Sequence, residues 1–154
     1  EYNTKHPDVS FEIDADTSRV EIFSVISGHG SGTTNENCAE FCNHTHHYTI
    51  DGAQEHVEAH SGVNTWYGCR DQTHLGGVPN QFGTWIFGRA GWCAGMDVHP
   101  WVADITADAA PGTHSMEYRS YLEGQDYTPT WTGQGDYNPE IRMSSWLIQY
   151  APTN

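Results

Sequence analysis

The chain has 154 residues, with 20 Asp and Glu against 6 Lys and Arg, so its formal net charge is −14 at pH 7. Such a charge repels nucleic acids and anionic membrane surfaces and leaves cations, neutral glycans and peptides as partners. The length fits a single domain over residues 1–154. No apolar stretch approaches the ~20 residues that cross a bilayer, so we expect no membrane insertion.

Six short runs of alternating apolar and polar residues predict β-strands. They are residues 9–13, 19–26, 47–50, 84–87, 114–122 and 144–150. Turn-rich stretches at residues 28–35 and 76–80 separate some of these runs, and only residues 102–110 could form a helical turn. The pattern predicts an all-β fold, an antiparallel jelly-roll sandwich.

The four cysteines are Cys38, Cys42, Cys69 and Cys93. Four cysteines allow three pairings, and paired thiols are typical of proteins in an oxidising compartment. Together with the abundant Trp, Tyr and Gly, they predict a secreted or periplasmic protein with disulfides. Because the sequence starts at Glu1 without Met, we expect a mature or trimmed segment.

Ten histidines are many for a chain of this length, and the densest group is His44-Thr45-His46-His47. Side chains alternate between the faces of a strand, so His44 and His46 share one face while Thr45 and His47 share the other. Two imidazoles on one face can clamp a metal ion, but tight binding needs a third ligand from another strand. The structural alternative is an exposed histidine pair without metal.

This tetrad resembles the H-T-H-H of the copper type II, ascorbate-dependent monooxygenases, the peptidylglycine α-hydroxylating family. The resemblance implies that His44 and His46 bind one copper ion and that Met143, just before the last predicted strand, completes the site. Two imidazoles suit Cu(II) and a thioether suits Cu(I), so such a site serves both oxidation states. Met96 and Met116 are competing thioethers without that family position.

The copper interpretation predicts an oxidoreductase that reacts with O₂ or peroxide at an open position on the metal. The family's second copper is held by a domain that is not in this sequence, so an external reductant such as ascorbate would have to supply electrons. The substrate is not readable from the residues. A copper carrier or scavenger without turnover is the alternative from the binding class.

A second resemblance covers more of the chain. Residues 27–30, 38–42, 83–93 and 99–101 are similar to the C-terminal jelly-roll domain of the peptide-N-glycosidase F family. It implies disulfides Cys38–Cys42 and Cys69–Cys93, and it maps Glu40 onto an acidic residue of that family's active-site cleft. The family's catalytic Asp lies in a preceding domain, so this resemblance implies a glycan-binding or deglycosylating domain whose amidase activity is in doubt.

Other interpretations of the same residues stay open. The set Cys38, Cys42, His44 and His46 could instead bind zinc if the thiols were reduced. His29, in a Gly-rich loop, is either a surface residue or a group that supports the metal ligands, and we expect His56, His60 and His74 to be solvated loop histidines. Trp66, Tyr67, Trp101 and Trp131 could stack on sugars or line a peptide groove, although packing of the sandwich explains most aromatic side chains.

Overall fold

The computed structural model describes residues 2–30, 38–60, 62–79, 83–129 and 138–152. Its strands are β1 (Val9–Ile13), β2 (Arg19–His29), β3 (His44–Ile50), β4 (Gln54–Ala59), β5 (Trp101–Asp104), β6 (Gly112–Leu122), β7 (Gln125–Asp126) and β8 (Glu140–Tyr150). Two short 3₁₀ helices, η1 (Asn3–Lys5) and η3 (Arg70–Leu75), complete the assigned elements. No helix among these residues is long and apolar enough to span a membrane.

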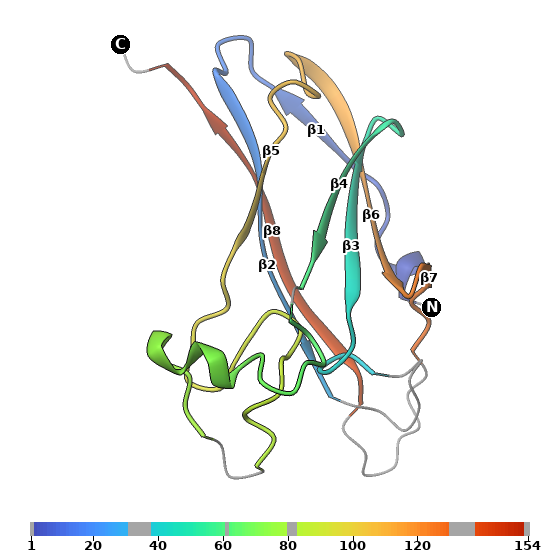
Figure 1. Ribbon diagram of the computed structural model, residues 1–154. Helices are drawn as coiled ribbons and strands as arrows, with labels where there is room; N and C mark the ends of the chain where they lie inside the picture. Colours follow the sequence, from blue (N-terminus) through green and yellow to red (C-terminus); the bar gives the residue numbers. More distant parts are fainter. Residues whose placement is uncertain (1, 31–37, 61, 80–82, 130–137, 153–154) are drawn as a thin grey trace.

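The strands form two antiparallel sheets that face each other (Figure 1). One sheet has the order β1-β6-β3-β4, with β7 paired to β6, and the other has the order β5-β2-β8. Every strand pairing is antiparallel. The predicted antiparallel sandwich with two disulfides is therefore confirmed.

The core lies between the inner faces of the two sheets. Its buried members are Ile13, Val20, Ile22, Ile26, Tyr48, Ile50, Ile105, Ala109 and Tyr118. The core contains a polar network as well, because the Tyr48 hydroxyl bonds to the hydroxyls of Ser24 (2.7 Å) and Ser145 (2.9 Å) across the two sheets. Each buried hydroxyl of this network is thus satisfied by another.

Three strands were not predicted, and each lacks the pattern on which the prediction rests. β4 carries three charged or amide side chains and a histidine in six residues because it is an edge strand with a mostly exposed face. β5 has only four residues, and it occupies the start of the predicted helical turn at 102–110. β7 has only two.

The predicted strand at residues 84–87 is wrong. This segment is a turn, closed by the hydrogen bond from the Phe87 amide to the Thr84 carbonyl (3.2 Å). Its apolar side chains pack among the loops rather than in a sheet, and the Ile86 carbonyl accepts bonds from the amides of Cys69 and Arg70. Apolar alternation in a disulfide-linked loop thus resembles that of a strand.

Candidate functional site

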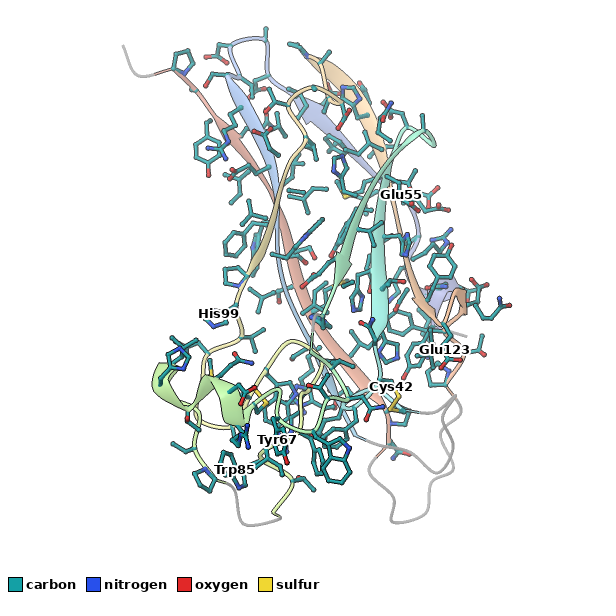
Figure 2. The ribbon with its side chains drawn as sticks, in the orientation of Figure 1. Cys42, Glu55, Tyr67, Trp85, His99 and Glu123 are labelled. Carbon is teal, nitrogen blue, oxygen red and sulfur yellow. A yellow bond between two sulfur atoms is a disulfide. The ribbon has the colours of Figure 1, made fainter. Side chains whose placement is uncertain are left out.

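Long loops gather at one end of the sandwich, and both disulfides lie there (Figures 1 and 2). Cys38 is joined to Cys42 and Cys69 to Cys93, the pairing that the glycosidase resemblance implies. The first bridge closes a tight loop directly before β3. The second ties the start of η3 to the segment that follows Arg89. The two bridges hold a buried ion pair between them.

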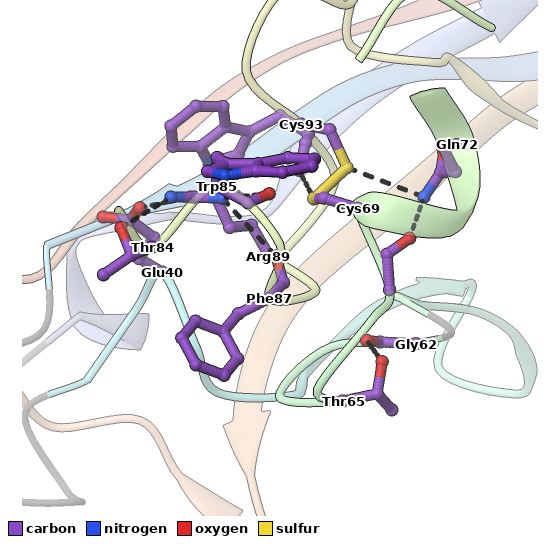
Figure 3. Close-up of a disulfide and its surroundings, with 12 residues drawn as sticks. Glu40, Gly62, Thr65, Cys69, Gln72, Thr84, Trp85, Phe87, Arg89 and Cys93 are labelled. Atoms are coloured by element: carbon purple, nitrogen blue, oxygen red, sulfur yellow. Dashed lines mark hydrogen bonds and ion pairs between the residues drawn. A yellow bond between two sulfur atoms is a disulfide. The ribbon is translucent and has the colours of Figure 1, made fainter. Parts of the chain in front are cut away.

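The ion pair joins Arg89 to Glu40. Arg89 Nε donates to Glu40 Oε1 at 2.6 Å, and the Arg89 side chain is only 1% exposed against 19% for Glu40. The guanidinium also donates to Thr84 Oγ1 (3.0 Å) and to the carbonyls of Trp85 and Phe87 (3.4 Å each), as Figure 3 shows in part. A fully buried cation therefore fixes a carboxylate that still reaches solvent.

The backbone around Glu40 is equally fixed. The Gly30 amide donates to Glu40 Oε2 (3.2 Å), and the Ala90 amide donates to the Glu40 carbonyl (2.8 Å). Gly28 lies where strand β2 meets this loop, and a Cβ there would sit 2.1 Å from the Ala39 carbonyl oxygen. The close approach of these segments requires glycine at position 28.

The stacked rings of His29 and Trp92 form a wall beside the ion pair. Their rings stack with centroids 5.0 Å apart, and Trp92 Nε1 donates to the Gly28 carbonyl at 2.8 Å. The Arg89 guanidinium lies 4.9 Å from the centroid of Trp92. His29 Nε2 bonds to Ser27 Oγ at 2.9 Å, and partial burial lowers its pKa. His29 is thus part of this wall and not a solvated loop residue.

Sequence reasoning missed Arg89 and Trp92 as site residues, although both lie in a segment that carries the glycosidase resemblance. A signal was present, because an Arg flanked by Gly and aromatic residues is unusual in a chain with 6 Lys and Arg in total. A cation in such an apolar stretch must be paired if it is buried.

His44 and His46 face inward on β3, as strand alternation predicts. Both are 1% exposed, whereas His47 on the opposite face is partly exposed and bonds to Glu55 (2.8 Å) and Thr45 (2.9 Å). Burial lowers the pKa of His44 to about 4 and that of His46 well below its ordinary value, so both rings are neutral at pH 7. Neutral imidazoles are competent metal ligands.

Met143 lies on the opposite sheet, on β8. Its sulfur accepts a hydrogen bond from the Tyr48 hydroxyl at 3.5 Å, and Tyr48 is two residues beyond His46 along β3. As the side chains stand, the described residues contain no group of three or more His, Cys, Asp or Glu arranged to hold a metal ion. The copper set of His44, His46 and Met143 stays a prediction.

The other candidate residues differ in their surroundings. His56 lies in β4 and bonds to Asp108 (3.0 Å), and His74 lies in η3. His60 is buried rather than solvated, with a side chain 7% exposed. Met116 lies in β6 against the core, and Met96 borders a cleft of about 300 Å³ beside the ion pair. The disulfides occupy the thiols that a Cys-His zinc site would need.

The aromatic candidates separate into two kinds. Trp66 and Tyr67 are 70% and 47% exposed, and Figure 2 shows Tyr67 among the loops at this end. Trp101 is part of the packing, since its ring stacks on that of Tyr48 with centroids 5.5 Å apart. Trp131 lies outside the described residues. The exposed rings therefore lie at the same end as Glu40.

Three solved structures are similar to this chain over nearly its whole length. A peptide-N(4)-(N-acetyl-β-D-glucosaminyl)asparagine amidase shares 22% identity with a TM-score of 0.71, and the match covers 96% of this chain and 44% of that one. PNGase F, a glycosylasparaginase from Flavobacterium meningosepticum, gives 22% identity, a TM-score of 0.71 and coverage of 95% and 44%. PNGF-II shares 16% identity with a TM-score of 0.64, and the match covers 95% of this chain and 25% of that one.

These likenesses establish the fold, and the chain spans less than half the length of each of these structures. No curated protein sequence matches the chain. The family model described as "Peptide-N-glycosidase F, C terminal" matches residues 1–148. The chain therefore belongs to the family of peptide-N-glycosidase F C-terminal domains.

Proposed function

We propose that this domain forms one side of a site for N-glycosylated peptides, in which Glu40 accepts hydrogen bonds from the glycan. The observation that carries the proposal is the Glu40–Arg89 pair, in which a 1% exposed guanidinium fixes a 19% exposed carboxylate. A carboxylate held in place needs little reordering to accept sugar hydroxyl or amide hydrogens.

The surroundings of Glu40 suit a neutral, polyhydroxylated ligand. A net charge of −14 disfavours anionic ligands but not an uncharged glycan. Exposed Trp66 at the same end presents a flat apolar face on which a sugar ring can stack, and so does the face of Tyr67 that the Arg70 guanidinium, 3.6 Å from its centroid, leaves free. Carboxylate acceptors combined with aromatic faces therefore make a glycan the favoured ligand.

Deglycosylation would need more than this domain presents. The similar amidase and glycosylasparaginase structures are more than twice the length that this chain covers. We propose that a second domain supplies the remaining catalytic groups and that this domain binds and orients the glycopeptide. The two disulfides agree with action in an oxidising, secreted or periplasmic setting.

The copper oxidoreductase and copper carrier hypotheses have less support. The matching family is that of the glycosidase C-terminal domains and not that of the copper monooxygenases. Within the described residues, the contact of the Met143 sulfur is with Tyr48. Copper with an ascorbate-type reductant therefore stays an untested hypothesis.

The test is binding of a peptide that carries N-acetylglucosaminyl-asparagine, measured by isothermal titration calorimetry. We expect Glu40→Gln to weaken binding at least about tenfold, because a charge-assisted hydrogen bond contributes about 1.5 kcal/mol or more. Binding should survive treatment with a chelator. Glu55→Gln on β4 is the matched control and should bind like the wild type; Figure 2 shows Glu55 far from Cys42, whose disulfide closes the loop that carries Glu40.

Circular dichroism of Glu40→Gln checks that the variant is folded under the conditions of the titration. Unchanged affinity in the folded variant would refute the role of Glu40. Loss of binding in the chelated wild type would also refute the proposal, since it would assign the ligand to a metal.

A further inference from the structure

The cleft of about 300 Å³ lies where the edge strands of the two sheets, β4 and β5, meet the disulfide-linked loops. Glu58 lines it from β4, Trp101 from the start of β5, and His60 from the residue that follows β4. Cys93, which is bonded to Cys69, lines it from the loops. Both sheets and one disulfide therefore contribute to its walls.

Close backbone contacts hold the loop walls of the cleft in place. A Cβ at Gly88 would overlap the Gly62 carbonyl oxygen, and a Cβ at Gly91 would overlap the carbonyl oxygen of Ile26. Gly62, Gly88 and Gly91 all line the cleft. The cleft is thus preformed, and a preformed site loses little free energy to ordering when a ligand binds.

Two buried polar side chains of the cleft each have an atom without a hydrogen-bond partner among the described residues. These atoms are Glu58 Oε2 and His60 Nε2, and both side chains are 7% exposed. Glu58 Oε1 lies 3.7 Å from His60 Nδ1, which is too long for a hydrogen bond between them. Buried polar groups are ordinarily bonded, so two unpartnered groups in the wall of a cleft indicate a ligand.

The two groups present acceptors and a carboxylate without a counter-charge. Burial lowers the pKa of His60 to about 4, so its ring is neutral at pH 7 and cannot neutralise Glu58. Burial alone raises the pKa of Glu58 to about 7, as expected for an unpaired carboxylate. When His60 carries its proton on Nδ1, its Nε2 is an acceptor. Arg89 also lines the cleft, but Glu40 compensates its charge at 2.6 Å.

The complementary ligand therefore carries a positive charge and N–H donors. Met96 and Trp101 line the cleft as well and present apolar surface to an alkyl chain. Asp97 lies exposed at the rim, where its carboxylate attracts cations. A metal ion is a poor match, because the described residues bring no three His, Cys, Asp or Glu groups together to hold one. An ammonium group needs only the two acceptors.

From this arrangement we infer that the cleft binds a primary alkylammonium ion, which donates to Glu58 and to His60 Nε2 while its alkyl chain packs on Met96 and Trp101. A free amine and a lysine side chain present the same chemical group. The inference goes beyond the proposed glycan site and does not depend on it, because Glu40 does not line the cleft.

The test is isothermal titration calorimetry of the 154-residue chain with n-butylammonium chloride, at about pH 8 and about 0.15 M salt. At this pH Glu58 is ionised and the amine is still protonated. We expect one site per chain with a Kd of about 1 mM or lower. Glu58→Gln should weaken binding at least about tenfold. Glu55→Gln, on the same strand with an exposed carboxylate, is the matched control and should bind like the wild type.

Tetramethylammonium carries the charge without an N–H donor and should bind at least about tenfold more weakly than butylammonium. Circular dichroism checks that each variant is folded. Absence of butylammonium binding would overturn the inference, as would equal affinity for tetramethylammonium. Equal weakening in Glu58→Gln and Glu55→Gln would also overturn it, because it would assign binding to the net charge of the protein.

Nα-acetyl-lysine amide in the same titration separates the two sources of the ammonium group. Binding of both amines extends the site to lysine side chains, whereas binding of butylammonium alone restricts it to free amines, and each result supports the inference. The glycopeptide titration with Glu40→Gln tests the glycan site separately, so the two proposals fail independently.

Discussion

Neutralising Glu40 should destabilise the fold because it leaves the Arg89 guanidinium buried without a counter-charge. Breaking a fully buried ion pair by removing one partner costs about 3–5 kcal/mol. Glu40 is 19% exposed and a Gln can still accept from Arg89 Nε, so we expect about 2 kcal/mol for Glu40→Gln. For a chain of this length, that is a fall in Tm of about 4–8 °C.

Urea unfolding at pH 7, followed by tryptophan fluorescence, measures the free energy in a double-mutant cycle. Arg89→Met removes the buried charge along with its bonds to Thr84 and two carbonyls, and should cost about 2–3 kcal/mol. Once Arg89 is Met, Glu40→Gln should cost almost nothing further. A double variant in which the two losses simply add would show that the pair is not coupled, and our reasoning about Arg89 would be wrong.

Two further predictions concern the backbone and a surface histidine. Gly28→Ala should lower the free energy of unfolding by about 3 kcal/mol or more, because the new Cβ meets the Ala39 carbonyl. Gly52→Ala has open space around the new Cβ and should lower the same free energy by only about 1 kcal/mol, through its positive φ. Equal losses for the two variants in urea unfolding would contradict this reasoning. The bond to Asp51 (2.7 Å) raises the pKa of His114, so its stabilising effect is complete below pH 6.5 and is lost as pH rises through that raised pKa. In an NMR titration Asp51→Asn should lower the pKa of His114, and an unchanged value would assign the shift elsewhere.

Strand periodicity predicted those parts of the fold in which one face of a strand is buried. The alternation at Val9–Ile13 matches β1 residue for residue, and the runs at residues 19–26, 114–122 and 144–150 cover most of β2, β6 and β8. It could not predict β4, whose exposed face hides the pattern. It also could not separate a strand from the turn at residues 84–87, because a short run of β-branched and aromatic residues is typical of strands and here packs among loops, with all four residues partly buried.

The site shows a similar division between local and long-range information. Alternation along one strand suffices to place His44 and His46 on the same buried face. The third partner depends on which strand pairs with β3, and sheet order is not readable from local periodicity. A resemblance pointed to Met143, whereas the register of β3 with β4 places Glu58 opposite His46, and the His60 ring lies 5.5 Å from that of His46.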